Sequence, residues 1–232
     1  MHDDNLLVVR EMPLFTTMSD ENFDNLLHGV QLQRFPAHDQ LITEGDPADF
    51  LHILVQGTVE LFGSSDDRET TMFVLRPVST YNVSAVLEDA VYLMSARTLS
   101  EADILMIPAE NLRNVMAVDV AFAHAMVKEL AVRYRTVIRV FKEQRLRSGV
   151  EKLANYLLRA NDQIGKDGQI VLTEDKRKLA VLLGMTPEYL SRALTELRKY
   201  GVEVHGSKIS LKNLDALNHL AKPNPLIDRR EI

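Results

Sequence analysis

The spacing of apolar residues along the chain changes twice. Residues 5–30 carry apolar positions at helical spacing, with Ser19 where a helix cap would stand. Between Leu32 and Pro108, short apolar runs of strand length alternate with glycine, aspartate, proline and serine, which is typical of β-strands joined by turns. Many short strands at this spacing predict a sandwich or a double-sheet jelly roll.

From Ala109 to Arg147 the period is helical again, and this stretch contains no glycine or proline. Steps of four and three residues separate the members of one apolar stripe: Phe122, Met126, Leu130, Tyr134, Val137 and Phe141. A helix from Ala117 to Leu146 would be ~45 Å long. One small β-roll is too short to cover the whole stripe of such a helix.

Two shorter helices are predicted within Lys176–Lys199. The apolar face of the first consists of Leu179, Ala180 and Leu183. Gly184 ends this helix, because glycine adopts left-handed conformations without steric cost. Thr186 is a good cap for the second helix, and Pro187 suits its first position. The inner face of the second helix consists of Leu190, Leu194 and Leu197.

The spacing of Ala180, Gly184 and Leu190 is similar to that of a helix-turn-helix. In that motif a small residue lies where the helices cross, glycine lies in the turn, and an apolar residue anchors the second helix. An ordinary αα-hairpin needs only a cap and an apolar stripe, so this stretch alone leaves both interpretations open.

After Gly201, the runs Val202–Val204 and Lys208–Leu211 predict a hairpin of the kind that forms the wing of a winged helix. Asn213 would cap a last helix, and we expect the tail from Lys222 onwards to be flexible. The predicted fold class is α+β, with an N-terminal β-roll, a long helix and a C-terminal winged helix-turn-helix.

Composition narrows the functional classes. The chain has 232 residues, of which 46% are apolar and 26% charged, so a packed core is achievable. It has no cysteine, which excludes disulfides, a cysteine nucleophile and a cysteine-held iron–sulfur cluster. The sequence shows neither a signal-peptide pattern nor an apolar run of the ~18 residues that span a bilayer. We therefore expect a cytoplasmic protein without a membrane partner.

The distribution of charge is more informative than its sum of −6. From residue 145 to the end there are 16 Lys and Arg against 11 Asp and Glu, a net charge of +5, which leaves −11 for residues 1–144. An acidic first part and a basic second part suit a sensor domain joined to a nucleic-acid-binding domain.

Two short motifs within residues 41–62 carry a family resemblance. Gly45-Asp46 followed by the segment 57–61, GTVEL, resembles the first half of a cyclic-nucleotide-binding β-roll. Together with the helix-turn-helix pattern, this chain resembles the Crp-Fnr family of bacterial transcription regulators from about Leu14 to Leu217. The resemblance implies a homodimer paired through the long helix, double-stranded DNA as ligand, and RNA polymerase as a partner. It also implies a sensor domain at 1–116, a dimerisation helix at 117–147 and a DNA-binding domain at 148–232.

Base contacts are expected near the start of the second helix of the motif. Glu188 can accept a hydrogen bond from cytosine, Arg192 can donate twice to guanine, and the small Ser191 can approach a base closely. In the family this Glu-x-x-Ser-Arg arrangement is associated with half-sites of the TTGAT type. Glu188 and Arg192 are also four residues apart, so a plain helix salt bridge is the alternative. The candidate DNA-binding residues are Thr186, Pro187, Glu188, Ser191, Arg192, Lys199 and Lys208, with Tyr189 expected to modulate them.

The effector motif of the family is missing. Relatives that bind cyclic AMP carry a Gly-Glu pair for the ribose and an Arg-Ser pair for the phosphate, and neither pair is present at the aligned positions. A buried cyclic phosphate without a cation would suffer an uncompensated desolvation cost, so cyclic AMP is not expected. The candidate effector-pocket residues are Asn82, Val83, Ser84, Tyr92 and Leu93.

The sequence does not decide what fills that pocket. Haem would suit an apolar pocket with a histidine ligand. The resemblance to Fnr-like regulators concerned with nitric oxide would then imply a nitric oxide or redox-gas sensor. No histidine stands in a recognisable ligand motif, so the pocket could equally be filled by its own side chains. No catalytic motif and no metal site are found, and an enzyme is not expected. A ligand-binding dimer that binds no DNA is the remaining alternative.

Overall fold

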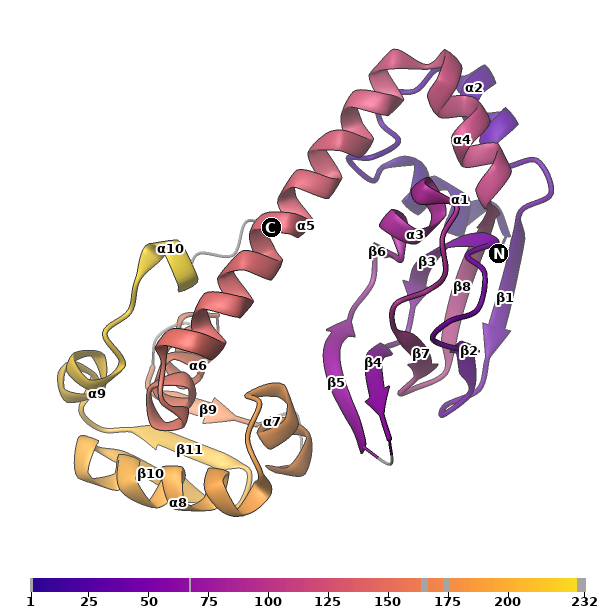
Figure 1. The fold of residues 1–232 in the computed structure, drawn as a ribbon. Helices are drawn as coiled ribbons and strands as arrows, with labels where there is room; N and C mark the ends of the chain where they lie inside the picture. The colour runs from indigo at the N-terminus through magenta and orange to yellow at the C-terminus, as the bar shows by residue number, and fades with distance from the viewer. Residues whose placement is uncertain (1, 67, 164–166, 173–175, 229–232) are drawn as a thin grey trace. The chain divides into compact units, whose positions relative to one another are not determined.

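The structure is a computed structural model that describes residues 2–66, 68–163, 167–172 and 176–228, and it confirms the mixed α+β fold (Figure 1). Contacts divide the chain into two compact units, Met1–Val132 and Arg133–Ile232. The helices are α1 His2–Arg10, α2 Asp20–Leu26, α3 Val83–Glu88, α4 Ala109–Val118, α5 Val120–Leu146, α6 Gly149–Gln163, α7 Lys176–Leu182, α8 Pro187–Leu197, the 3-10 helix η1 Arg198–Tyr200, α9 Leu214–Ala221 and α10 Pro225–Asp228. The strands are β1 Gln31–Phe35, β2 Gln40–Ile42, β3 Phe50–Gln56, β4 Val59–Ser65, β5 Arg68–Leu75, β6 Ser79–Tyr81, β7 Ser95–Thr98, β8 Ala102–Pro108, β9 Gln169–Val171, β10 Val202–His205 and β11 Lys208–Leu211.

The first unit is built on two four-stranded antiparallel sheets. The strand order is β1-β8-β3-β6 in one sheet and β2-β7-β4-β5 in the other. Buried side chains of both sheets, such as Ile53 and Leu61, belong to one hydrophobic cluster, so the sheets share a core, as the sequence predicts. Gly57 links β3 to β4 with φ 94°, and a Cβ there would overlap the backbone around Ala102. Only glycine fits this turn.

The segment after β6 differs from the prediction. The sequence pattern of residues 80–86 favours a strand, whereas the structure forms the short helix α3 (Figure 1). Asn82 adopts a left-handed conformation with φ 60°, which its short polar side chain tolerates, and the chain leaves the sheet there. Val83 and Val86 then lie three residues apart on the buried face of the helix. Apolar residues that resemble a strand therefore form the inner side of one helical turn.

The predicted helical stretch from Ala109 to Arg147 is interrupted once. α4 ends at Val118, and Asp119 is extended before α5 begins at Val120. The Asp119 carboxylate accepts hydrogen bonds from the Phe122 N–H and from Asn22 Nδ2, both at 2.8 Å. These bonds lower the pKa of Asp119, the Phe122 N–H contributing most. Asp119 therefore caps α5 and ties its start to α2.

The second unit packs three helices around a small sheet. α6, α8 and α9 contribute Leu157, Leu194 and Leu217 to one core, and the sheet order is β10-β11-β9. The β10–β11 hairpin is the predicted wing. Asn213 caps α9 by accepting a hydrogen bond from the Ala216 N–H at 3.0 Å, as the sequence predicts.

The C-terminal tail is more ordered than the sequence suggests. Residues 225–228 form α10, and the Asp228 carboxylate accepts two hydrogen bonds from Arg147, at 2.6 and 2.7 Å, and one from Arg159 at 3.0 Å. Glu143 lies within 3.4 Å of the same two guanidinium groups. The expectation of a flexible tail is therefore wrong for residues 225–228. The partners lie too far away along the sequence for local composition to indicate them.

Candidate functional site

The helix-turn-helix geometry follows from local chemistry. Gly184 has φ 64°, and the Met185 N–H donates to the Ala180 carbonyl oxygen at 3.0 Å, closing the turn after α7. The Thr186 hydroxyl accepts a hydrogen bond from the Tyr189 N–H at 3.2 Å, and Pro187 opens α8. These predictions are confirmed. Thr173, a possible cap for α7, lies outside the described residues.

The two faces of α8 differ in chemistry. Leu190, Ala193, Leu194 and Leu197 are buried in the core of the unit. Glu188, Ser191 and Arg192 are exposed on the outer face, where i, i+3 and i+4 positions are neighbours. A helix that is anchored on one side and polar on the other can insert into a groove without unfolding its own domain.

The electrostatics at the start of α8 are set by the helix itself. The pKa of the Glu188 carboxyl is lowered, first by a hydrogen bond from its own backbone N–H, next by the Thr186 hydroxyl, and least by the charge of Arg192. The Arg192 guanidinium lies 5.7 Å from the centroid of the Tyr189 ring. The charge of Arg192 is therefore the weakest of the effects that lower the pKa of Glu188.

The two lysines in the predicted set occupy different places. Lys199 lies in η1, beyond the C-terminal end of α8, and Lys208 opens β11 in the wing; both are exposed. Eleven residues separate Lys199 from Glu188, about 16 Å along a helix. The structure therefore groups Thr186, Pro187, Glu188, Ser191 and Arg192 together and places both lysines outside that group.

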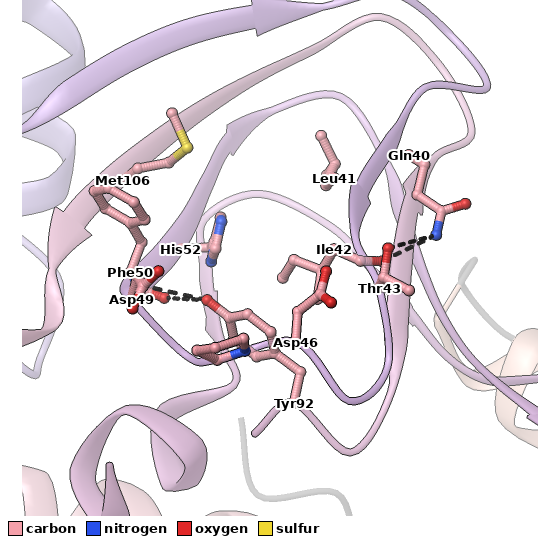
Figure 2. Close-up of a pocket in the computed structure, with 11 residues that line it drawn as sticks. Gln40, Leu41, Ile42, Thr43, Asp46, Asp49, Phe50, His52, Tyr92 and Met106 are labelled. Atoms are coloured by element: carbon pink, nitrogen blue, oxygen red, sulfur yellow. Dashed lines mark hydrogen bonds between the residues drawn. The ribbon is translucent and has the colours of Figure 1, made fainter. Parts of the chain in front are cut away.

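A pocket of about 450 Å³ opens in the β-roll (Figure 2). Its lining consists of Gln40, Leu41, Ile42, Thr43, Asp46, Pro47, Asp49, Phe50, His52, Tyr92 and Met106. Of the five predicted effector residues, only Tyr92 lines it. Asn82 and Val83 lie at the start of α3, Ser84 is exposed, and Leu93 is 75% exposed.

Tyr92 is held in the pocket wall by strand β3. Its hydroxyl donates to the Phe50 carbonyl oxygen at 3.0 Å and accepts from the Phe50 N–H at 3.4 Å (Figure 2). His52, two residues after Phe50 in β3, is 5% exposed and stacks on Tyr81 with ring centroids 5.2 Å apart. His52 is not among the residues that the sequence predicts for the pocket. The sequence feature that could have indicated His52 is its position as a polar residue inside the otherwise apolar run FLHILV.

The lining lacks cationic partners for haem, although it includes one histidine, His52. It contains no lysine or arginine to pair with the propionate groups, and the carboxylates of Asp46 and Asp49 stand there instead. Across the described part of the chain, no group of three or more His, Asp or Glu side chains is arranged to hold a metal ion.

A β-roll joined through a long helix to a winged helix-turn-helix defines a two-domain regulator that binds DNA. The sequence models agree: the cyclic nucleotide-binding domain matches residues 32–119, and the Crp-like helix-turn-helix domain matches residues 151–220. The chain belongs to the Crp-Fnr family of transcription regulators, whose members are not enzymes.

Two relatives extend over most of the chain. A CRP-like cAMP-activated global transcriptional regulator from Mycobacterium tuberculosis is 22% identical over 194 residues, which cover 81% of this chain and 87% of the relative. The anaerobic regulatory protein of Bacillus subtilis is 25% identical over 207 residues, 85% of each chain.

Solved structures show the same fold. FixK2 from Bradyrhizobium japonicum superposes with a TM-score of 0.65 and 22% identity, over 82% of this chain and 96% of that one. A CooA double mutant from Carboxydothermus hydrogenoformans gives a TM-score of 0.71 and 19% identity, over 91% and 96% of the two chains. Within the described residues, no helix combines the length and hydropathy needed to traverse a bilayer.

Proposed function

We propose that this regulator binds, as a homodimer, a palindromic site with TTGAT-like half-sites, and that it acts there on RNA polymerase. In this proposal residues 1–116 form the sensor domain, 117–147 the dimerisation helix and 148–232 the DNA-binding domain. The observation that carries the proposal is the exposed face of α8, on which Glu188, Ser191 and Arg192 lie together. Their side chains match the donors and acceptors of a G·C-containing half-site in the major groove.

The backbone contacts of the proposal come from the same helix. The positive end of the α8 helix dipole, at Thr186 and Pro187, can attract a phosphate. Lys208 in the wing and Lys199 after α8 would add sequence-independent contacts to the backbone, since both are exposed cations.

The dimer is supported by the exposed apolar residues of α5. Val127, Tyr134, Val137 and Phe141 are 51–67% exposed, and with the half-buried Leu130 they repeat at steps of three and four. This is the a/d spacing of a two-stranded coiled coil. Two-fold pairing would present two copies of α8 to half-sites about 34 Å apart.

The first test is a gel-shift titration with a palindromic TTGAT-type duplex. The comparison duplex has the half-site guanines replaced by other bases. We expect Arg192→Ala to lose about 1–3 kcal/mol per half-site of the preference for the TTGAT-type duplex over this comparison duplex. Arg198→Ala is the matched control, because it removes an exposed arginine beyond the end of α8. Equal binding by the wild type and Arg192→Ala would show that the base-contact assignment is wrong, and no binding by the wild type would favour a dimer that binds no DNA.

We further propose that cyclic AMP is not the effector. The pocket offers no cation to a cyclic phosphate, and two carboxylates, Asp46 and Asp49, would repel it. The mycobacterial relative is described as cAMP-activated, so this chain should differ from that relative in cyclic AMP binding. Isothermal titration calorimetry with cyclic AMP should give no binding heat at micromolar concentrations, and a micromolar dissociation constant would overturn the proposal.

A further inference from the structure

Tyr189 is a residue of α8 whose ring lies against the first turn of α6. Its backbone N–H is fixed by the hydrogen bond to the Thr186 hydroxyl at 3.2 Å. Its ring covers Gly149, the first residue of α6: a Cβ built on Gly149 would overlap Cε1 of the ring and lie 3.0 Å from Cζ. The ring therefore occupies the space that any other residue at position 149 would fill.

Backbone conformation does not explain this glycine. Gly149 is absent from the glycines with positive φ in the described chain, so alanine could adopt the same backbone and would favour the helix. The feature that distinguishes Gly149 is the contact with Tyr189. The glycine is needed for space rather than for flexibility.

The Tyr189 ring also lies close to Arg192, one of the proposed base-contacting residues. The Arg192 guanidinium lies 5.7 Å from the ring centroid, within range of a cation–π interaction. Glu188 and Glu196 both lie four residues from Arg192, and the pKa of Glu188 is lowered more by its own N–H and the Thr186 hydroxyl than by the charge of Arg192. An exposed arginine would otherwise sample many rotamers, and ordering it on DNA would cost conformational entropy.

We propose that Tyr189 is a positioning residue that holds Arg192 in its base-contacting direction, and that Gly149 provides the space in which the ring can do so. This inference rests on the proposed function, because it assumes that Arg192 contacts a base. It assigns sequence discrimination to a contact between α6 and α8 that touches no DNA. Any side chain at position 149 would displace the ring and release the guanidinium.

The test measures discrimination between the palindromic TTGAT-type duplex and the duplex with the half-site guanines replaced. Tyr189→Phe keeps the ring and should keep discrimination. Tyr189→Ala should lower discrimination by about two- to fivefold per half-site, with binding to the replaced duplex unchanged. Gly149→Ala should lower it to the same extent while the melting temperature stays equal or rises.

The double variant separates positioning from a general structural effect. If Gly149 acts through the ring, Gly149→Ala should have no further effect in the Tyr189→Ala background. Equal losses in both backgrounds would overturn the role of Gly149. Full discrimination by Tyr189→Ala, together with loss in Arg192→Ala, would overturn the inference and leave the proposed function standing. Absence of any preference in the wild type would overturn both.

Discussion

At the scale of single residues, His52 shows how burial changes chemistry. The imidazole is 5% exposed between the rings of Tyr81 and Tyr92, and its Nδ1 has no hydrogen-bond partner among the described residues. Burial lowers the pKa of His52 to about 4, although a hydrogen bond with the Phe50 backbone opposes the change. The side chain is therefore neutral at physiological pH, and the β-roll has a built-in sensitivity to acid.

The sign of that sensitivity follows from proton binding. Between about pH 6.5 and pH 4 the unfolded chain binds a proton at His52 and the folded chain does not, so the free energy of unfolding falls as the pH is lowered through this window, by up to about 1.4 kcal/mol per pH unit. We expect His52→Phe to remove this slope in urea unfolding followed by circular dichroism. The exposed His28→Phe should keep it, and an unchanged slope in His52→Phe would contradict the buried neutral state.

The helix caps could be predicted from the sequence where the capping side chain and its hydrogen-bond partner lie within a few residues of each other. The caps Ser19, Thr186 and Asn213 bond to N–H groups three residues further on, so the sequence alone indicates them. Asp119 also caps a helix in this way, but its second partner, Asn22, is 97 positions away. The break that Asp119 introduces before α5 was missed because nothing nearby interrupts the helical pattern.

At the scale of elements, α10 is the clearest case of long-range stabilisation. The Asp228 carboxylate is only 14% exposed, and Arg147 is 6% exposed. Burial alone would raise the pKa of Asp228, but hydrogen bonds from Arg147 and the Asn224 N–H, with the charges of Arg147 and Arg159, lower it overall. The ionised form therefore fixes the segment to Arg147, directly after α5, and to Arg159 of α6.

We expect Asp228→Asn to release α10 and to lower the free energy of unfolding by about 1–3 kcal/mol, because Arg147 loses its strongest partner in a buried place. Hydrogen exchange should show faster exchange at Ile227 and Asp228, whose N–H groups bond to the Asn224 carbonyl oxygen. Since the folded pKa is lowered, the stabilisation is present above about pH 4 and is lost as the pH falls through the folded value. Asp215→Asn, an exposed acid in the same unit, should leave exchange at α10 unchanged; slow exchange in Asp228→Asn would contradict the role of the carboxylate.

At the scale of the whole molecule, the net charge is negative in the first part of the chain and positive in the second. Residues 1–144 carry a net charge of −11 and residues 145–232 carry +5, so attraction to DNA is concentrated in the second part. In the proposed dimer, a second copy of α5 would cover the exposed apolar side chains of this helix, because they repeat at a/d spacing.

The dimer can be tested without DNA. We expect Val137→Glu to place two carboxylates opposite each other at a d position and to convert a dimer into a monomer at micromolar concentrations, measured by sedimentation velocity. Lys128→Glu introduces the same residue at an exposed b position and should remain dimeric. A monomeric wild type, or a dimeric Val137→Glu variant, would show that α5 is not the interface.

The sequence by itself determined the order of the domains, the strand-rich β-roll, the helix-turn-helix and the exposed face of α8. Each depends on hydrophobic period, turn residues or caps, which act over a few positions. Only the tertiary structure decided that residues 83–88 form a helix, that His52 lines the pocket, that Asp228 fixes the C-terminal segment, and that the ring of Tyr189 covers Gly149. These features join residues that are distant in sequence, and their energies come from burial and contact geometry that no local pattern contains.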